Sequence, residues 1–343
     1  MPTKGPAIRV SVVGTGFGRR VVAPAFAAAG CEVVDVVSAR DAAAVAELCS
    51  RPVDLVSIHS PPYLHAPHVG IAVDHGRAVL CDKPFGRSTA EAEEMLAAAE
   101  AAGVVHLLNF EFRHEPARLH VKGLLDEGEI GRPEHLQWSA INSGSRVPVR
   151  RHGWLFDRSL GGGWIGAWGS HAVDAVRWLL GDVVDAGATT RVTITERPDG
   201  EGRLRTCDAE DAFTAWLRLQ GGATAALDTS FAAALTLASR LTILGDAGSI
   251  ESVNDHRITV RSADGRRQEV ELPRATGDSH DTAMRRWAEV VRDAVAAGRQ
   301  IAPSFADGVA CARVLDAFRG TATGQPAADR TQWPTTEGET HGK

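Results

Sequence analysis

Short apolar runs alternate with alanine-rich stretches over the first third of the chain. The runs lie at residues 8–13, 32–37, 54–58 and 104–110. Apolar strands separated by helices are typical of a parallel sheet. The clearest helix begins at Ser88, which forms a capping box with Glu91, and ends before Gly103, a suitable left-handed helix end. This part is therefore expected to be an α/β domain.

Beyond about residue 130, strand-like runs follow one another more closely. They lie at residues 134–141, 183–196, 211–219, 223–231, 239–244 and 257–260. Turn signals such as Gly221-Gly222 and Asp264-Gly265 separate several of them and favour antiparallel pairing. Helices are expected near residues 172–180, 280–297 and 304–319. The pattern predicts a second, α+β domain with a large, mainly antiparallel open sheet.

Composition and charge argue against several classes of function. The 343 residues are 44% hydrophobic, which is enough to fill two cores. A net charge of −6 has the wrong sign for nucleic-acid binding, so no such partner is expected. No apolar run of about 18 residues exists, which predicts a cytoplasmic protein without a membrane partner. The five cysteines are scattered, and no metal site is expected.

A glycine-rich turn, Gly14-Thr15-Gly16-Phe17-Gly18-Arg19, joins the first strand to the first helix. In a dinucleotide site Gly14 allows the tight turn, and Gly16 lets the pyrophosphate approach the backbone at the helix N-terminus. A strict G-x-G-x-x-G motif has glycine where Arg19 stands, so Gly18 falls one position early. The turn predicts a dinucleotide site, with a purely structural glycine turn as the alternative.

The second strand ends at Ser38-Ala39-Arg40, where NAD-specific enzymes usually carry an acid for the ribose hydroxyl. A serine and a cation suit a 2′-phosphate, so NADP is expected in preference to NAD. Asp35 or Asp41 could still support NAD binding, and Arg40 could be a solvated loop residue.

Several further segments carry residue types that suit an active site. Two of them, residues 57–65 and 79–84, follow strands whose carboxyl ends are expected to face a ligand. Others are Asn109-x-x-x-Arg113-x-x-Pro116, residues 128–133 and the glycine-rich residues 161–174. In this order and spacing they resemble the glucose-fructose oxidoreductase, inositol dehydrogenase and rhizopine-catabolism (Gfo/Idh/MocA) family over about residues 8–320.

Pattern and resemblance together predict the domain organisation. A Rossmann domain is expected over residues 1–118, a substrate and oligomerisation domain over 119–330, and a polar tail over 331–343. The family is commonly dimeric or tetrameric, so a homodimer or homotetramer formed through the C-terminal sheet is expected.

The resemblance also implies site residues. Lys83 matches the lysine of the family's Glu-Lys-Pro motif, which lies beside the nicotinamide, and Asp82 replaces the glutamate; Lys83 and His171 are the expected catalytic residues. The residues expected to bind the cofactor are Gly14, Gly16, Phe17, Gly18, Arg19, Ser38, Arg40, Ser60, Pro61, His65, Asp82, Lys83, Pro84 and Asn109. The residues expected to bind substrate are Lys83, Arg113, Trp154, Trp168 and His171.

One position departs from the family pattern. The family carries Asp-x-x-x-His, in which the carboxylate can orient the imidazole, but Ala167 stands four residues before His171. Lys83 and His171 could suffice, the chemistry could be lost, or another group could substitute. The candidates for that group are Asp157, Glu111 and His152.

Other residues of these motifs keep two interpretations. Asp174 could partner His171 or be structural, and Arg113 could face a ligand or form an ion pair between the domains. Trp164 and Trp168 could form an apolar wall for a sugar ring or belong to the core.

The expected function is hydride transfer between nicotinamide and a secondary alcohol or ketone of a sugar, cyclitol or related small molecule. The alternatives are an imine or conjugated-bond reductase, an NAD-dependent glycosidase and a non-catalytic dinucleotide-binding protein.

Overall fold

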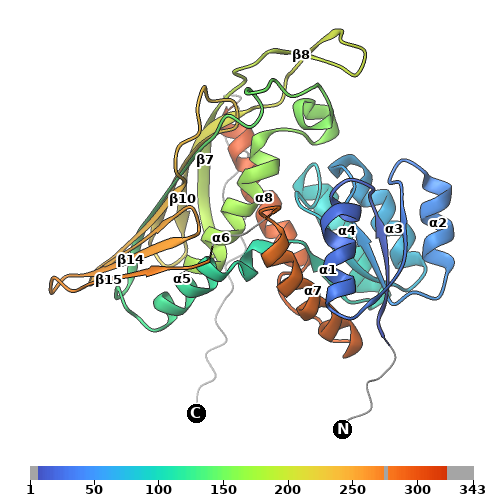
Figure 1. Cartoon of the computed structure of the whole chain (residues 1–343), viewed down its shortest axis with the longest axis horizontal. Helices are drawn as coiled ribbons and strands as arrows, with labels where there is room; N and C mark the ends of the chain where they lie inside the picture. Colours follow the sequence, from blue (N-terminus) through green and yellow to red (C-terminus); the bar gives the residue numbers. More distant parts are fainter. Residues whose placement is uncertain (1–6, 274–276, 323–343) are drawn as a thin grey trace.

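The computed structural model describes residues 7–273 and 277–322, so the expected polar tail at 331–343 lies outside the described residues. Two sheets organise the chain (Figure 1). The first has five parallel strands in the order β2-β1-β3-β4-β5. They are β1 (Arg9–Val13), β2 (Glu32–Val37), β3 (Leu55–Ile58), β4 (Ala78–Cys81) and β5 (His106–Leu108). This confirms the predicted Rossmann sheet, with a shorter last strand than expected.

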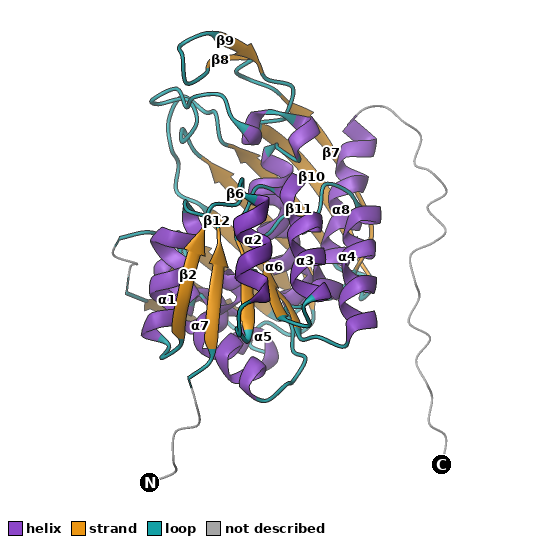
Figure 2. Ribbon diagram, turned by 90° about the vertical axis from the view of Figure 1, so that its right-hand side faces the viewer, coloured by secondary structure: helices purple, strands orange, loops and turns teal. Residues whose placement is uncertain are grey.

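Helices cover both faces of this sheet, which explains why its strands are mostly apolar. On one face pack α2 (Ala42–Ser50), α3 (His65–Asp74) and α4 (Thr89–Ala102), which lie next to one another in Figure 2. On the other face α1 (Ala23–Ala28) follows a five-residue π-helical segment, η1 (Gly18–Val22). Helix α4 has the predicted ends, since Ser88 caps its first turn and Gly103 is left-handed at φ 64°.

The second sheet has eight strands in the order β15-β14-β13-β12-β6-β11-β10-β7, and only the β6–β11 pair is parallel. The strands are β6 (Pro133–Ile141), β7 (Val183–Arg191), β10 (Ala212–Leu219), β11 (Thr224–Ser230), β12 (Arg240–Gly245), β13 (Gly248–Val253), β14 (Arg257–Ser262) and β15 (Arg267–Glu271). The mainly antiparallel open sheet is thus confirmed.

The predicted strand at 183–196 is wrong in its second half. Strand β7 ends at Arg191, and β8 (Glu196–Pro198) pairs instead with β9 (Leu204–Thr206) in a separate hairpin (Figure 2). The buried carboxylate of Asp211 accepts hydrogen bonds from the main-chain N–H groups of Thr193 and Ile194, at 2.8 and 3.1 Å. These bonds replace strand pairing and redirect the chain.

Among residues 7–273 and 277–322, helices cover only one face of the second sheet. They are α5 (Pro116–Asp126), α6 (Ser170–Leu180) and α8 (Phe305–Ala322), and α6 and α8 share an apolar core with the strands. On the opposite face Thr214, Trp216 and Arg218 of β10 are exposed. None of the helices in the described part of the chain is both long and apolar enough to cross a membrane.

The chain returns to the first sheet after completing the second. Helix α7 (Asp281–Ala296) lies beside α1, and its Trp287 is buried with Val10 and Val12 of β1 (Figure 1). The domain boundary at residue 118 stays a prediction, but a segment far beyond it completes the N-terminal core. This return brings the residue before α7, His280, to the first domain.

Candidate active site

A cavity of about 520 Å³ opens where strands β1 to β4 end. This edge is where open parallel sheets bind ligands. Additional walls come from η3 (Glu111–His114), η4 (Trp154–Phe156) and the residue before α7. The lining residues are Gly14, Thr15, Gly16, Phe17, Ser38, Ala39, Arg40, His59, Ser60, Pro61, Pro62, Asp82, Lys83, Glu111, Trp154 and His280.

The glycine turn has the geometry of a phosphate-binding turn. Gly14 has φ +129°, and a Cβ there would lie 2.5 Å from the carbonyl oxygen of His59. A Cβ on Gly16 would meet open space at the cavity, whereas one on Gly18 would lie 2.9 Å from a methyl of Val12. The first glycine therefore allows the bend, the second leaves the backbone open to a ligand, and the third allows close packing on β1. These properties fit the pyrophosphate of a dinucleotide.

Most of the expected cofactor residues line this cavity, and five do not. Gly18 lies beneath the turn, and Arg19 donates to the main-chain oxygen of Val36 at 3.0 Å. Pro84 faces Gly166, since a Cβ on Gly166 would lie 3.3 Å from Cγ of the proline ring. The other two, His65 and Asn109, are fully buried behind the cavity wall.

Asp82 anchors the loop that carries Lys83. Its carboxylate contacts Nδ1 of His59 at 3.1 Å and accepts bonds from the N–H of Lys83 at 2.8 Å and Nδ2 of Asn109 at 3.3 Å. Burial acts to raise the pKa of Asp82, but the hydrogen bond and charge of His59 outweigh it and lower that pKa. The far side of the His59 ring contacts the hydroxyl of Ser57 at 2.7 Å, which fixes the ring.

Lys83 lines the cavity, and its ammonium donates to the main-chain oxygen of Ala167 at 2.9 Å. The position that lacks the family's aspartate therefore contacts the expected catalytic lysine through its backbone. An ammonium has three N–H donors, so this bond leaves donors for a substrate oxygen.

His65 joins two loops behind the wall. Its ring nitrogens contact the carbonyl oxygens of Ser60 at 2.8 Å and Phe85 at 3.3 Å. Burial lowers the pKa of His65. Its position indicates a structural role, because it does not reach the cavity.

His171 lies behind the cavity and is only 6% exposed. Its ring packs edge-on against Phe112, with 4.6 Å between centroids. Burial, followed by the positive charges of Lys83 and other cations, holds the pKa of His171 well below its usual value. The imidazole is therefore neutral near pH 7.

Glu111 lies between two histidines, and of the three groups considered as substitutes for the missing aspartate it alone lines the cavity. Its Oε1 is 2.6 Å from Nδ1 of His280 and 4.0 Å from Nε2 of His171. The other two groups lie elsewhere: Asp157 accepts from the N–H of Ser159 at 2.9 Å, and the main-chain N–H of His152 donates to Pro198 at 2.8 Å.

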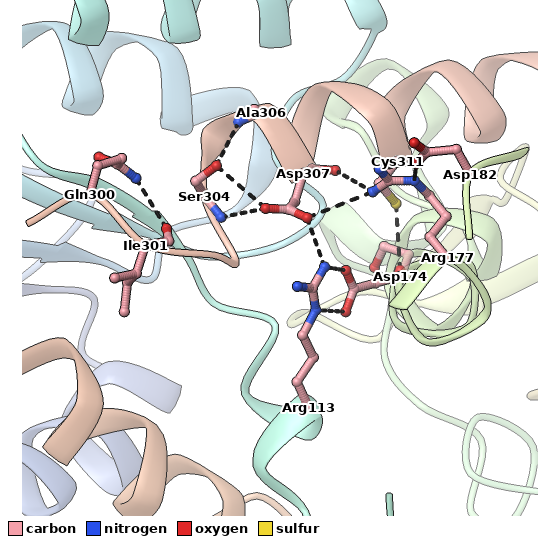
Figure 3. A network of polar contacts seen from close by, with 11 residues as sticks. Arg113, Asp174, Arg177, Asp182, Gln300, Ile301, Ser304, Ala306, Asp307 and Cys311 are labelled. Carbon is pink, nitrogen blue, oxygen red and sulfur yellow. Dashed lines mark hydrogen bonds and ion pairs between the residues drawn. The ribbon is translucent and has the colours of Figure 1, made fainter. Parts of the chain in front are cut away.

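Arg113 forms an ion-pair network outside the cavity (Figure 3). Its guanidinium binds Asp174 through two bonds, of 2.6 and 3.0 Å, and Asp307 at 2.8 Å. Burial raises the pKa of Asp174 despite the opposing charge of Arg113. Asp174 thus partners Arg113 and not His171, and the network joins η3 to α6 and α8.

The tryptophans separate into one at the cavity and others in the core. Trp154 lines the cavity. Trp168 packs edge-on against Trp138, with centroids 5.2 Å apart, and Trp164 stacks on Phe231 at 4.2 Å. Trp164 and Trp168 therefore pack in the core and do not form a wall of this cavity, so the expected substrate contact of Trp168 is not found here.

Five residues that line the cavity were not among the expected site residues: Thr15, Ala39, His59, Pro62 and His280. His59 directly follows β3 and belongs to residues 57–65, one of the segments that resemble the family. Its place at the end of a parallel strand could have predicted it. His280 precedes a helix far along the chain, and no local pattern marks it. Within residues 7–273 and 277–322, no group of three or more His, Cys, Asp or Glu side chains could hold a metal ion.

The fold and cavity define a Rossmann-type dinucleotide-binding protein with a second, sheet-based domain. Residues 8–110 match the NAD-binding Rossmann-fold domain of the GFO/IDH/MocA oxidoreductases, and residues 119–251 match the C-terminal domain of the same family. The chain belongs to this family of oxidoreductases.

Individual proteins agree with this assignment. An uncharacterized oxidoreductase of Synechocystis is 31% identical over 273 residues, which cover 74% of each chain. Inositol 2-dehydrogenase of Streptomyces avermitilis is 28% identical over 268 residues, covering 77% of this chain and 72% of that protein. The structure of a levoglucosan dehydrogenase in complex with NADH superposes with a TM-score of 0.83 at 23% identity, covering 93% of this chain and 98% of that one.

Two glycine substitutions separate folding from ligand binding at the turn. Gly14→Ala forces a methyl against His59 at a strained φ, so the free energy of unfolding should fall by about 1–3 kcal/mol or more. Gly16→Ala meets only open space, so this energy should change by less than about 0.5 kcal/mol. Its methyl would still intrude on the pyrophosphate, so NADPH affinity should fall about tenfold. Urea denaturation and NADPH fluorescence titration measure both, and unchanged NADPH affinity in Gly16→Ala would contradict this site.

Proposed function

We propose that the protein is an NADP-preferring dehydrogenase that acts on a secondary alcohol or ketone of a sugar, cyclitol or related small molecule. The observation that carries this proposal is that Lys83 lines the same cavity as the glycine turn. The substrate class draws on relatives whose names specify inositol and levoglucosan.

The cavity offers a surface for each part of the cofactor. The backbone around Gly16 would hold the pyrophosphate, and Ser38 and Arg40 would hold the adenosine ribose. The nicotinamide would lie toward Lys83. A bound nicotinamide dinucleotide supplies the hydride acceptor or donor.

Lys83 would bind the substrate oxygen and stabilise the negative charge that develops there during oxidation. The bond to Ala167 and the anchored Asp82 loop hold the ammonium in place beforehand. His171 would act from behind the wall as a positioning residue, because its imidazole is buried and neutral.

Glu111 bears on the choice among reaction types. Because Ala167 replaces the family's aspartate, imine reduction was one of the alternative functions. That reaction needs no carboxylate beside the imidazole. A buried carboxylate at the cavity supports alcohol chemistry instead.

The preference for NADP has its own support. Arg40 lines the cavity, and among the described residues it has no carboxylate partner. The two acids that could have supported NAD are engaged elsewhere. Asp41 caps α2 by accepting from the N–H of Ala44 at 3.0 Å, and Asp35 binds Arg51 at 3.0 Å.

The exposed face of the second sheet supports the proposed homodimer or homotetramer. Trp216 is 46% exposed there, in the middle of β10. Helices of the described residues leave this face uncovered, so a second copy of the sheet would bury Trp216 together with the exposed Leu244 of β12.

Lys83→Ala tests the proposed chemistry. We expect turnover of a sugar or cyclitol substrate to fall about 10²- to 10⁴-fold, because the group that stabilises the charge on the substrate oxygen is lost. NADPH affinity should change less than about threefold, because the residues proposed to hold the phosphates are unchanged. For comparison, a tenfold change in affinity corresponds to about 1.4 kcal/mol. Steady-state kinetics and fluorescence titration measure the two quantities.

The matched control for that experiment is Lys122→Ala, whose ammonium binds Asp126 on the surface of α5. It should retain wild-type turnover. Wild-type rates in Lys83→Ala would refute the assignment, and turnover without net change in NADPH absorbance would indicate a glycosidase.

Arg40→Ala tests the cofactor preference. Loss of a charge-assisted bond to the 2′-phosphate, worth about 1.5–3 kcal/mol, should raise the KM for NADPH roughly 10- to 100-fold. The KM for NADH should stay nearly constant and serves as the internal control. Equal effects on both cofactors would show that Arg40 does not recognise the 2′-phosphate.

A further inference from the structure

A carboxylate and an imidazole from distant parts of the chain meet at the cavity. Glu111 of η3 and His280, which precedes α7, are 169 residues apart in sequence, and their side chains are joined by a 2.6 Å bond. The Glu111 side chain is 1% exposed and that of His280 is 28% exposed, and both line the cavity. The pair therefore has a buried member and a member that a ligand can reach.

The chemistry of the bond fixes which nitrogen remains available. A carboxylate oxygen only accepts hydrogen bonds, so Nδ1 of His280 carries the proton and donates it to Glu111. In the neutral ring, Nε2 is then the acceptor. An imidazole held in this way by a carboxylate is arranged to accept a proton from a substrate hydroxyl.

One polar atom of the pair and one next to it have no hydrogen-bond partner among the described residues. They are Oε2 of Glu111 and Nε2 of His171, and both are buried. Each such atom costs about 1–3 kcal/mol, and such atoms in native structures call for a functional or solvent explanation. His171, Glu111 and His280 thus form a row, in which Glu111 lies in the middle and His280 is the most exposed member.

Neighbouring rings hold His280 in place. Phe17 of the glycine turn packs edge-on against it, with centroids 5.0 Å apart, and Phe112 packs from the other side at 4.8 Å. Phe17 also packs on His59, which binds the Asp82 carboxylate next to Lys83. His280 and Lys83 therefore belong to connected walls of one cavity.

We propose that His280 is the proton-transfer residue of the reaction and that Glu111 positions it, in place of the aspartate absent at position 167. This inference rests on the proposed function. During alcohol oxidation the substrate O–H bond breaks and its proton goes to Nε2 of His280. The electron pair on oxygen forms the carbonyl as hydride leaves the same carbon for the oxidised nicotinamide. Lys83 stabilises the oxygen, and His280 later releases its proton to water.

A purely structural role is the competing explanation, because the same bond joins η3 to the start of α7. Loss of a structural bond would lower stability without making turnover depend on added imidazole. Chemical rescue therefore separates the two explanations.

The test combines His280→Ala with free imidazole, using a substrate that the wild-type protein turns over. We expect kcat to fall about 10²- to 10⁴-fold and to recover in part as imidazole is added, while NADPH affinity stays near the wild-type value. Glu111→Gln should lower kcat without imidazole rescue, because His280 is still present but no longer oriented. His114→Gln, in which the altered ring stacks on Trp287 of α7, is the control for packing between η3 and α7 and should keep wild-type kcat.

A spectroscopic measurement does not depend on turnover. Long-range ¹H–¹⁵N NMR of the wild-type protein should show the neutral His280 ring protonated on Nδ1, and Glu111→Leu should remove this preference. The opposite tautomer in the wild type overturns the proposal even if His280→Ala fails to fold.

The failures can be told apart. A wild-type protein that turns over no sugar or cyclitol refutes the proposed function and this inference with it. An active wild type whose His280→Ala variant keeps full kcat, or loses kcat in proportion to NADPH affinity without rescue, refutes the role of His280 alone.

Discussion

The largely buried carboxylate of Asp82 ties together the ends of three neighbouring strands. It contacts His59 after β3, the main chain of Lys83 after β4 and Asn109 after β5. A buried charge is stable only when it is paired and hydrogen-bonded, so these three loops are constrained to one arrangement. That arrangement places Lys83 in the cavity wall, and the proposed chemistry depends on it.

A second constraint holds the two domains together beside the cavity. Arg113 is shared between Asp174 of α6 and Asp307 of α8 (Figure 3). Breaking one side of such a buried network typically costs about 3–5 kcal/mol, because a charge is left without its partner. The network does not line the cavity. Arg113 was expected to contact substrate, but it instead fixes the cavity walls relative to one another.

The sequence predicted what local patterns encode. Strand β2 at 32–37 and the caps of α4 follow from apolar runs, a capping box and a glycine, all within a few residues of one another. The end of β7 could not be predicted, because the side chain that redirects it, Asp211, lies about 20 residues further along the chain. The same limit applies to the site: Glu111 was a candidate once Ala167 was noted, but His280 reaches it only because α7 returns to the first sheet.

The central claim is that a nicotinamide dinucleotide binds along the glycine turn with its reactive ring beside Lys83. A crystal structure of the NADPH complex tests it most directly. The account predicts the pyrophosphate against the backbone at Gly16, the 2′-phosphate at Arg40 and the nicotinamide next to the Lys83 ammonium. A dinucleotide bound outside this cavity, or one whose nicotinamide points away from Lys83, would contradict the account.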